Sequence, residues 1–181
     1  MSNWEQSFKY YLLFENIMEI FDGSGESYDY RGPFGMAGKG NSKVYLFDYT
    51  TADGEEREMR AEFFATNLPE VYEVAFRHTD PKGENPYEEI SGAEKIIPLL
   101  NTITNIMEDF YKKNPDIKAL VYQAEDSRLN LYAPMFKGIE KKGEIFPGWE
   151  SGTHFKIGPR HVHYIKEKGY DLSTIDQTTL L

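Results

Sequence analysis

Two histidines separated by one residue are the first candidates for chemistry in this sequence. His161 and His163 flank Val162, and because side chains alternate between the two faces of a β-strand, both imidazoles are expected on the same face. Neutral imidazole is a common zinc ligand, and a converging carboxylate would extend such a site. The sequence has no HExxH-type helix and no second histidine cluster. The pair is therefore a candidate metal site, and a half-exposed polar strand is the alternative.

The segment 125–138, which reads EDSRLNLYAPMFKG, is the second candidate. Asp126 or Ser127 is a typical helix N-cap, and Ser127 lacks the flanking glycines of a nucleophile elbow, so capping explains it without catalysis. Arg128 at the helix start is a candidate for binding a carboxylate or a protein partner. The apolar residues that follow are spaced by three and four positions and predict a face that packs on a sheet: Leu129, Tyr132 and Phe136.

The glycine-rich segment 22–42 is predicted as a long loop. It carries no Gly-Lys-Ser/Thr phosphate-binding pattern. Exposed aromatic residues on a loop suit a protein-binding surface, and Tyr28, Tyr30 and Phe34 are the candidates. The alternative is a loop that folds these aromatic side chains back onto the core.

The elements that must position these residues follow from periodicity and turn signals. Residues 4–21 and about 96–113 have helical spacing, and Asp53-Gly54 lies between two strand patterns. Strands are expected at 44–49, 56–65, 71–76 and 117–123, a helix at 127–138, one or two closing strands within 153–165, and a polar tail at 170–181. This order predicts an α+β fold, with helices packed on a central mixed, mostly antiparallel sheet.

Composition excludes several classes of protein. The 181 residues favour a single domain over 1–181, and the absence of cysteine excludes a disulfide framework and thiolate metal sites. A net charge of −10 disfavours nucleic-acid binding. The N-terminal residues have acidic positions within their apolar pattern, so neither a signal peptide nor a membrane span is expected.

The order of elements resembles the GNAT acetyltransferase superfamily over about residues 44–165. A three-strand meander is followed by helix, strand, helix and strand, as in that family. The family's last helix has the pattern Asn, then Leu-Tyr, then Gly-Phe. Here Ser127 replaces the Asn, Leu131-Tyr132 match the Leu-Tyr, and Lys137-Gly138 stand nearest to the Gly-Phe pair.

This resemblance implies a cofactor and site residues. The cofactor would be acetyl-coenzyme A, with Gly92 and Ala93 at the start of the helix that holds its pyrophosphate. Tyr132 would be the general acid that protonates the leaving thiolate. The sequence departs from the family at the phosphate-binding segment, where Glu88 and Glu89 would face two phosphates. Like charges in a confined site repel one another, which argues against a working coenzyme A site.

Three short patterns are also similar to uncharacterised proteins of tailed bacteriophages. These are the Tyr-x-Val-x-Phe strand, the Ser-Gly-Ala helix start and the Ser-Arg-x-x-Leu-Tyr helix. We therefore predict a non-enzymatic phage-type protein without a cofactor, a virion component or an inhibitor of a host or defence factor. It would bind a protein partner or itself through Tyr28, Tyr30, Phe34 and Arg128, in the host cytoplasm or the virion. The alternative is a GNAT-type acyltransferase that uses acetyl-coenzyme A.

Overall fold

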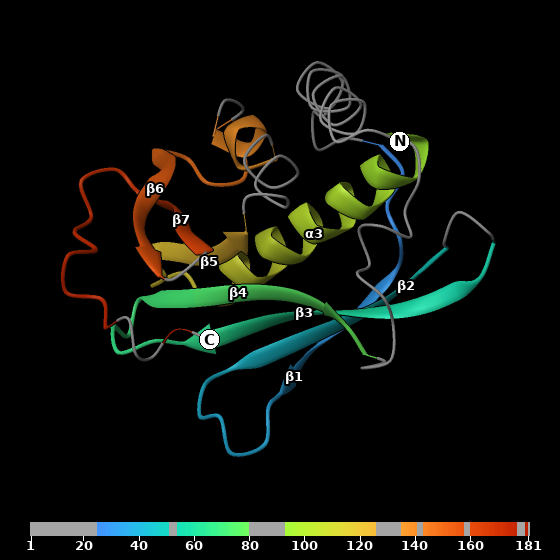
Figure 1. Cartoon of the computed structure of the whole chain (residues 1–181), viewed down its shortest axis with the longest axis horizontal. Helices are drawn as coiled ribbons and strands as arrows, with labels where there is room; N and C mark the ends of the chain where they lie inside the picture. Colours follow the sequence, from blue (N-terminus) through green and yellow to red (C-terminus); the bar gives the residue numbers. More distant parts are fainter. Residues whose placement is uncertain are drawn as a thin grey trace.

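One seven-stranded sheet forms the centre of the computed structural model, which describes residues 25–50, 54–79, 93–125, 135–140, 143–157, 160–176 and 180. The strand order is β1-β2-β3-β4-β5-β7-β6 (Figure 1); the β4–β5 pair is parallel and the other neighbours are antiparallel. The strands are β1 (Tyr30–Gly35), β2 (Lys43–Thr50), β3 (Glu56–Ala65), β4 (Val71–His78), β5 (Ala119–Glu125), β6 (Trp149–Ile157) and β7 (Arg160–Glu167). This confirms the α+β prediction and its mixed, mostly antiparallel sheet.

The β2–β3 hairpin was predicted and is present, with Lys43 opposite Phe63 and Thr50 opposite Glu56. Its alternating pattern produces two different faces. Tyr45, Phe47 and Tyr49 are buried in the main core, whereas the intervening Asp48 is exposed. We call the face that carries the main core the inner face, and the opposite one the outer face.

The strand β1 lies within the segment predicted as a loop, so that prediction is wrong over residues 30–35. Proline is tolerated at a sheet edge, because one side of an edge strand needs no ladder donor, and Pro33 occupies such a position. Gly32 permits the close approach to β2: its φ is 133°, and a Cβ there would lie 2.9 Å from the Val44 carbonyl oxygen. Glycine and proline are typical of loops, and for this reason the sequence pattern did not indicate the edge strand β1.

The helix α3 (Ala93–Lys113) covers the inner face of the sheet (Figure 1). Its apolar stripe is fully buried, and the Phe110 ring stacks on Phe63 with centroids 3.8 Å apart. Lys112 and Lys113 lie in the last turn, where positive charge interacts favourably with the helix dipole. Because the helix begins at Ala93, Pro98 lies inside it.

Two strands close the sheet on the side of β5 that faces away from β4. The strand β7 pairs with β5, and β6 pairs antiparallel with β7. The predicted break at Gly158-Pro159 lies outside the described residues, between the end of β6 and the start of β7. The predicted order was helix, three strands, helix, strand, helix, strand. The structure retains the GNAT-like order of β2 to β7, adds β1, and forms two closing strands, one of the two numbers predicted. The predicted first helix, residues 4–21, lies outside the described residues.

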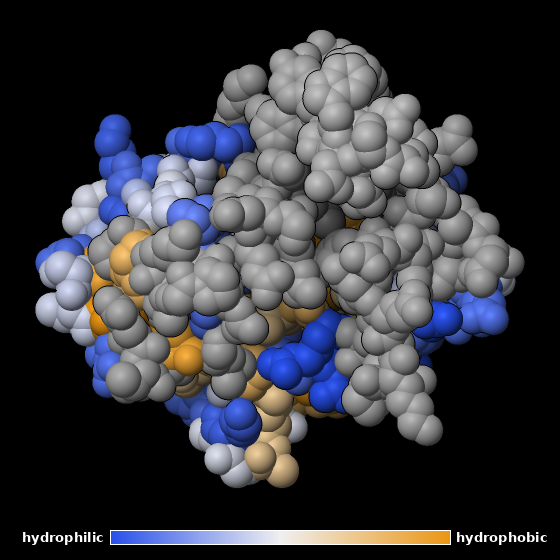
Figure 2. All heavy atoms as spheres, viewed as in Figure 1, coloured by the Kyte–Doolittle hydropathy of each residue, from blue (hydrophilic) through white to orange (hydrophobic). Residues whose placement is uncertain are grey.

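The C-terminal residues, predicted as a polar tail, contribute to a second core on the outer face. Leu172 and Ile175 are buried against Val71, Val121 and Val162 of three neighbouring strands. Figure 2 shows hydrophobic residues at the surface in small areas on the side where Figure 1 places this segment. The segment is polar in composition, and the buried Leu172 and Ile175, with Tyr170 and Leu180 packed against the same cluster, decide where it packs.

In the described part of the chain, no helix has the length and apolar character that crossing a membrane requires.

Candidate functional site where β4 and β5 separate

The parallel strands β4 and β5 pair over a short stretch and then separate. Their ladder joins Val71–Glu73 to Ala119–Val121. Beyond it, β4 continues along β3 as far as His78, and β5 continues along β7 as far as Glu125. Adjacent parallel strands thus diverge toward their carboxyl ends, the place at which open sheets of this kind accept ligands.

Cross-strand charges on the outer face hold β4 against β3 beyond the point of separation. The Glu62 carboxylate, only 3% exposed, forms ion pairs with Arg60 on its own strand and with Arg77 of β4. A carboxylate buried this deeply requires such partners, since an unpaired buried charge is strongly unfavourable. These pairs fix β4 to β3 where β5 no longer accompanies it.

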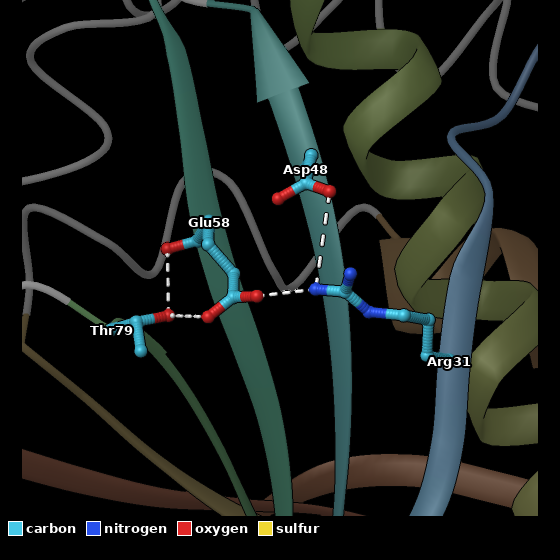
Figure 3. A network of polar contacts seen from close by, with 4 residues as sticks. All are labelled: Arg31, Asp48, Glu58 and Thr79. Atoms are coloured by element: carbon cyan, nitrogen blue, oxygen red, sulfur yellow. Dashed lines mark hydrogen bonds and ion pairs between the residues drawn. The ribbon is translucent and has the colours of Figure 1, made fainter.

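A second polar network performs the same task at the end of β4 (Figure 3). The Thr79 backbone N–H and hydroxyl both donate to the Glu58 carbonyl oxygen, each over 3.1 Å, and the hydroxyl also lies 2.8 Å from Glu58 Oε1. Arg31 of β1 reaches across β2 to form an ion pair with Glu58, and its guanidinium lies 3.9 Å from Asp48. The network joins the edge strand to the end of β4 through two intervening strands.

On the outer face, one hydrogen bond spans the start of the opening. Gln123 Nε2 of β5 donates to Glu73 Oε1 of β4 over 2.7 Å, and Glu73 is 2% exposed. The bond lies next to the last paired residues of the two strands. It therefore limits how far apart β4 and β5 can move at the point where their backbones separate.

On the inner face, Tyr122 is the first residue of β5 beyond the paired stretch. Its ring is stacked with Phe136 at 4.3 Å and with His163 at 5.1 Å, and it is 4% exposed. Burial raises the pKa of the Tyr122 hydroxyl well above its ordinary value. The hydroxyl is therefore protonated at neutral pH and able to donate a hydrogen bond.

His163 of β7 lies directly opposite Tyr122 and is 4% exposed. Its Nδ1 lies 3.0 Å from Thr153 Oγ1 of β6, and its Nε2 is buried without a hydrogen-bond partner in the part of the chain that the structure describes. Burial, with a smaller contribution from the charge of His161, lowers the pKa of the His163 imidazole. The ring is therefore neutral at physiological pH.

The two histidines lie on one face of β7, as predicted, with ring centroids 6.1 Å apart. In the described ranges, no group of three or more His, Asp or Glu residues gathers in a way that could hold a metal ion. His161 and His163 thus have no third ligand of these types within those ranges, and the metal hypothesis receives no support there.

The other predicted site residues are distributed differently. Tyr132, Arg128 and Gly92 lie outside the described residues, and Ala93 is the first residue of α3. Tyr28 and Tyr30 pack against the main core, which agrees with the alternative that the loop folds its aromatics inward. Phe34 is 46% exposed. A protein-binding role for these residues stays a prediction.

Sequence reasoning missed four residues of this site: Glu73, Tyr122, Gln123 and Thr153. Strand alternation does place Tyr122 on the inner face and Glu73 and Gln123 on the outer face. No local pattern, however, marks the residue at which two parallel strands stop pairing. The site was therefore not recognisable before the tertiary structure.

The sequence matches no family model and no curated protein. Solved structures with similarity to this chain include the aminoglycoside acetyltransferase AAC(6')-Ib with paromomycin and acetyl-coenzyme A (12% identity, TM-score 0.41, covering 72% of this chain and 67% of that one). The same enzyme with coenzyme A and kanamycin is similar at 12% identity and a TM-score of 0.40, covering 72% of this chain and 69% of that one. The aminoglycoside N-acetyltransferase AAC(6')-Ib11 is similar at 12% identity and a TM-score of 0.39, and the match covers 70% of this chain and 66% of that one. These values describe a partial likeness of fold and carry no information about substrate.

The comparisons contradict the prediction of a non-enzymatic phage-type protein. The similar structures are acetyltransferases, which is the class that the resemblance implied as the alternative. The prediction relied on the departure of the segment around Glu88 and Glu89 from the family pattern, and these residues lie outside the described ranges. The GNAT-like strand order is confirmed.

Proposed function

We propose that this chain is a GNAT-type acyltransferase that binds an acyl-coenzyme A between β4 and β5. The observation that carries the proposal is the end of the β4–β5 ladder at Glu73 and Val121, while both strands continue with other neighbours. Open sheets that contain parallel strands generally bind ligands at the carboxyl ends of such strands, which supports the proposal.

The residues around the opening fit an extended ligand that carries amide groups. Where two strands separate, their facing edges no longer bond to each other, and backbone groups at such an edge require partners of another kind. The Gln123–Glu73 bond spans the outer side of this edge, so a ligand lying along the strands has a defined boundary there. Acyl-coenzyme A has an extended amide-containing arm, and it supplies the acyl group as a thioester whose carbonyl carbon accepts a nucleophile.

The chain's own groups would orient the reacting atoms and exclude water. Tyr122 lies on the inner face next to the separation, and its raised pKa keeps the hydroxyl protonated. Phe136 and the stacked rings beside it provide an apolar surround. Low polarity strengthens any hydrogen bond that the site makes to a developing charge.

Binding to the folded chain tests the proposal. A ligand at one hundred times its dissociation constant stabilises the native state by about 2.7 kcal/mol, which for a chain of this size raises the melting temperature by roughly 5–11 °C. We expect a rise of this order with acetyl-coenzyme A or coenzyme A. No rise at millimolar concentrations of either compound would refute the proposed function.

A variant of the opening provides the control for specificity. Gln123→Glu places a second carboxylate beside Glu73. We prefer this change to Val121→Pro, because proline would remove a backbone hydrogen-bond donor from the paired stretch and would endanger folding. Repulsion between the two carboxylates should alter the separation of β4 and β5 and weaken the binding of coenzyme A. The matched change Asn41→Asp, at an exposed turn distant in sequence, adds the same charge and should leave binding unchanged.

A further inference from the structure

The His163 imidazole carries a buried polar atom, Nε2, for which the described residues supply no hydrogen-bond partner. Nδ1 of the same ring lies 3.0 Å from Thr153 Oγ1. A buried polar atom without a partner is unfavourable by about 1–3 kcal/mol. Such atoms are few in native proteins, and one in a well-packed site points to a ligand or to a chemical role.

The hydrogen bond to Thr153 assigns the tautomer of His163. Thr153 is exposed, so its hydroxyl can donate to solvent and accept a bond from Nδ1–H. The opposite tautomer would leave a buried N–H without an acceptor, and orphaned N–H donors are rarer than under-satisfied acceptors. Nδ1 therefore carries the proton, and Nε2 presents a lone pair.

The position of the ring relates this lone pair to the proposed acyl site. Tyr122, His163 and Thr153 are directly opposed residues on β5, β7 and β6. Tyr122 is the first residue of β5 past the point where β4 leaves it, so the His163 backbone lies one strand from the opening, about 5 Å from that of β5. The two rings are stacked at 5.1 Å on the inner face.

The charged surroundings favour an unprotonated ring. The titratable groups that face His163 from the described elements are Tyr122 of β5, which burial keeps neutral, and His161 of its own strand. Thr153 of β6 is uncharged, and no ion pair joins His163 to a carboxylate of the described residues. Nothing here stabilises an imidazolium before substrate binds, so Nε2 is available to accept a proton at neutral pH.

We propose that His163 Nε2 accepts the proton of the acyl acceptor's ammonium group, an inference that rests on the proposed acyltransferase function. The ammonium N–H bond breaks, and its proton forms the Nε2–H bond of an imidazolium. The freed amine lone pair forms an N–C bond to the thioester carbonyl carbon, and the C–S bond breaks. The thiolate of coenzyme A leaves with that electron pair. As the nitrogen becomes an amide, a second N–H bond breaks, and that proton passes through solvent to the thiolate. His163 then releases its proton to solvent, aided by repulsion from His161.

Nitrogen-15 NMR of the free protein tests the inference without any substrate. His163→Gln assigns the His163 signals by their loss. We expect Nδ1 protonated and Nε2 unprotonated at pH 8, and a titration below the usual pH of about 6.5 for histidine. His161→Gln is the matched control, and it should move the His163 titration to higher pH because it removes a neighbouring positive charge. A protonated Nε2 at pH 8 would overturn the inference.

The second test measures the rate of acetyl transfer, with acetyl-coenzyme A as donor and benzylamine, spermidine and poly-L-lysine as acceptors. General-base catalysis contributes about 10²–10⁴-fold, so His163→Gln should lower the transfer rate at pH 7 by that factor and leave coenzyme A binding unchanged. The acidic limb of the pH–rate profile should disappear in the same variant.

The two proposals fail in distinguishable ways. Wild-type protein that does not bind coenzyme A would refute the acyl site itself, and with it the role of His163. Wild-type protein that binds coenzyme A and transfers acetyl groups, with a His163→Gln variant equally fast across pH, would refute the role of His163 alone. In that case the unpartnered Nε2 is a packing feature.

Discussion

Gln123 Nε2 of β5 donates a hydrogen bond over 2.7 Å to Glu73 Oε1 of β4, beside the last residues at which the two backbones pair. The bond connects strands that diverge immediately afterwards. Its acceptor is a carboxylate only 2% exposed, so the contact contributes both to stability and to the width of the opening.

Removal of this hydrogen bond should be measurable. Gln123→Ala deprives a buried carboxylate of a donor, and hydrogen bonds to charged groups contribute about 1.5–3 kcal/mol. We expect a decrease of that size in the free energy of unfolding, measured by urea denaturation. Asn41→Ala, at an exposed turn, should change it by less than about 0.5 kcal/mol. Equal stability of the two variants would show that the bond does not hold the strands.

Gly32 should tolerate no side chain. Its φ of 133° is unfavourable for any other residue, and a Cβ would lie 2.9 Å from the Val44 carbonyl oxygen and 3.1 Å from the Tyr45 ring. Gly32→Ala should therefore destabilise the fold by about 1–3 kcal/mol. Gly35→Ala on the same strand is the matched control, because no atom lies within 4 Å of its Cβ position. Thermal unfolding of both variants measures the difference, and similar melting temperatures would contradict the placement of β1 against β2.

The stability of the protein should decrease in mild acid partly because of His163. Burial lowers the pKa of this imidazole in the folded state below the value of about 6.5 that it has in an unfolded chain. Between the two pKa values the unfolded chain binds a proton that the folded chain does not. The free energy of unfolding therefore falls as the pH drops below about 6.5, and levels off with respect to this group below the folded pKa.

His163→Phe isolates this contribution, since a phenyl ring retains the stack on Tyr122 and cannot be protonated. Denaturation between pH 4.5 and 7.5 should give a shallower dependence for the variant than for the wild type. Carboxylates titrate in both proteins and cancel in the comparison. Parallel curves would mean that the folded and unfolded pKa values of His163 are the same.

Local patterns predicted much of the framework. The β2–β3 hairpin follows from two strand-forming runs on either side of the turn dipeptide Asp53-Gly54, and α3 follows from apolar residues at three- and four-residue intervals. The histidine pair was predicted on one strand face, and it lies there. These features depend on residues close in sequence, and so the sequence alone specifies them.

Local patterns failed where a distant partner decides the outcome. β1 contains a glycine and a proline and becomes a strand because β2 offers it an edge to pair with. The polar C-terminal residues pack because Leu172 and Ile175 meet an apolar part of the outer face formed by three strands. In both cases the stabilising contact is long-range and leaves no periodic signal in the segment itself.

The sequence by itself therefore determined α3, the strands β2 to β5, the faces that they present and an order that resembles acetyltransferases. Only the tertiary structure decided where β4 and β5 separate, because that point depends on partners distant in sequence: beyond it β4 stays paired with β3, and β5 stays paired with β7. Arg77 and Thr79 bind residues of β3, and a side-chain hydrogen bond from Gln123 of β5 reaches Glu73 on the opposite side of β4. The same assembly places His163 opposite Tyr122, and it converts a pair of strand histidines into a candidate proton acceptor beside the opening.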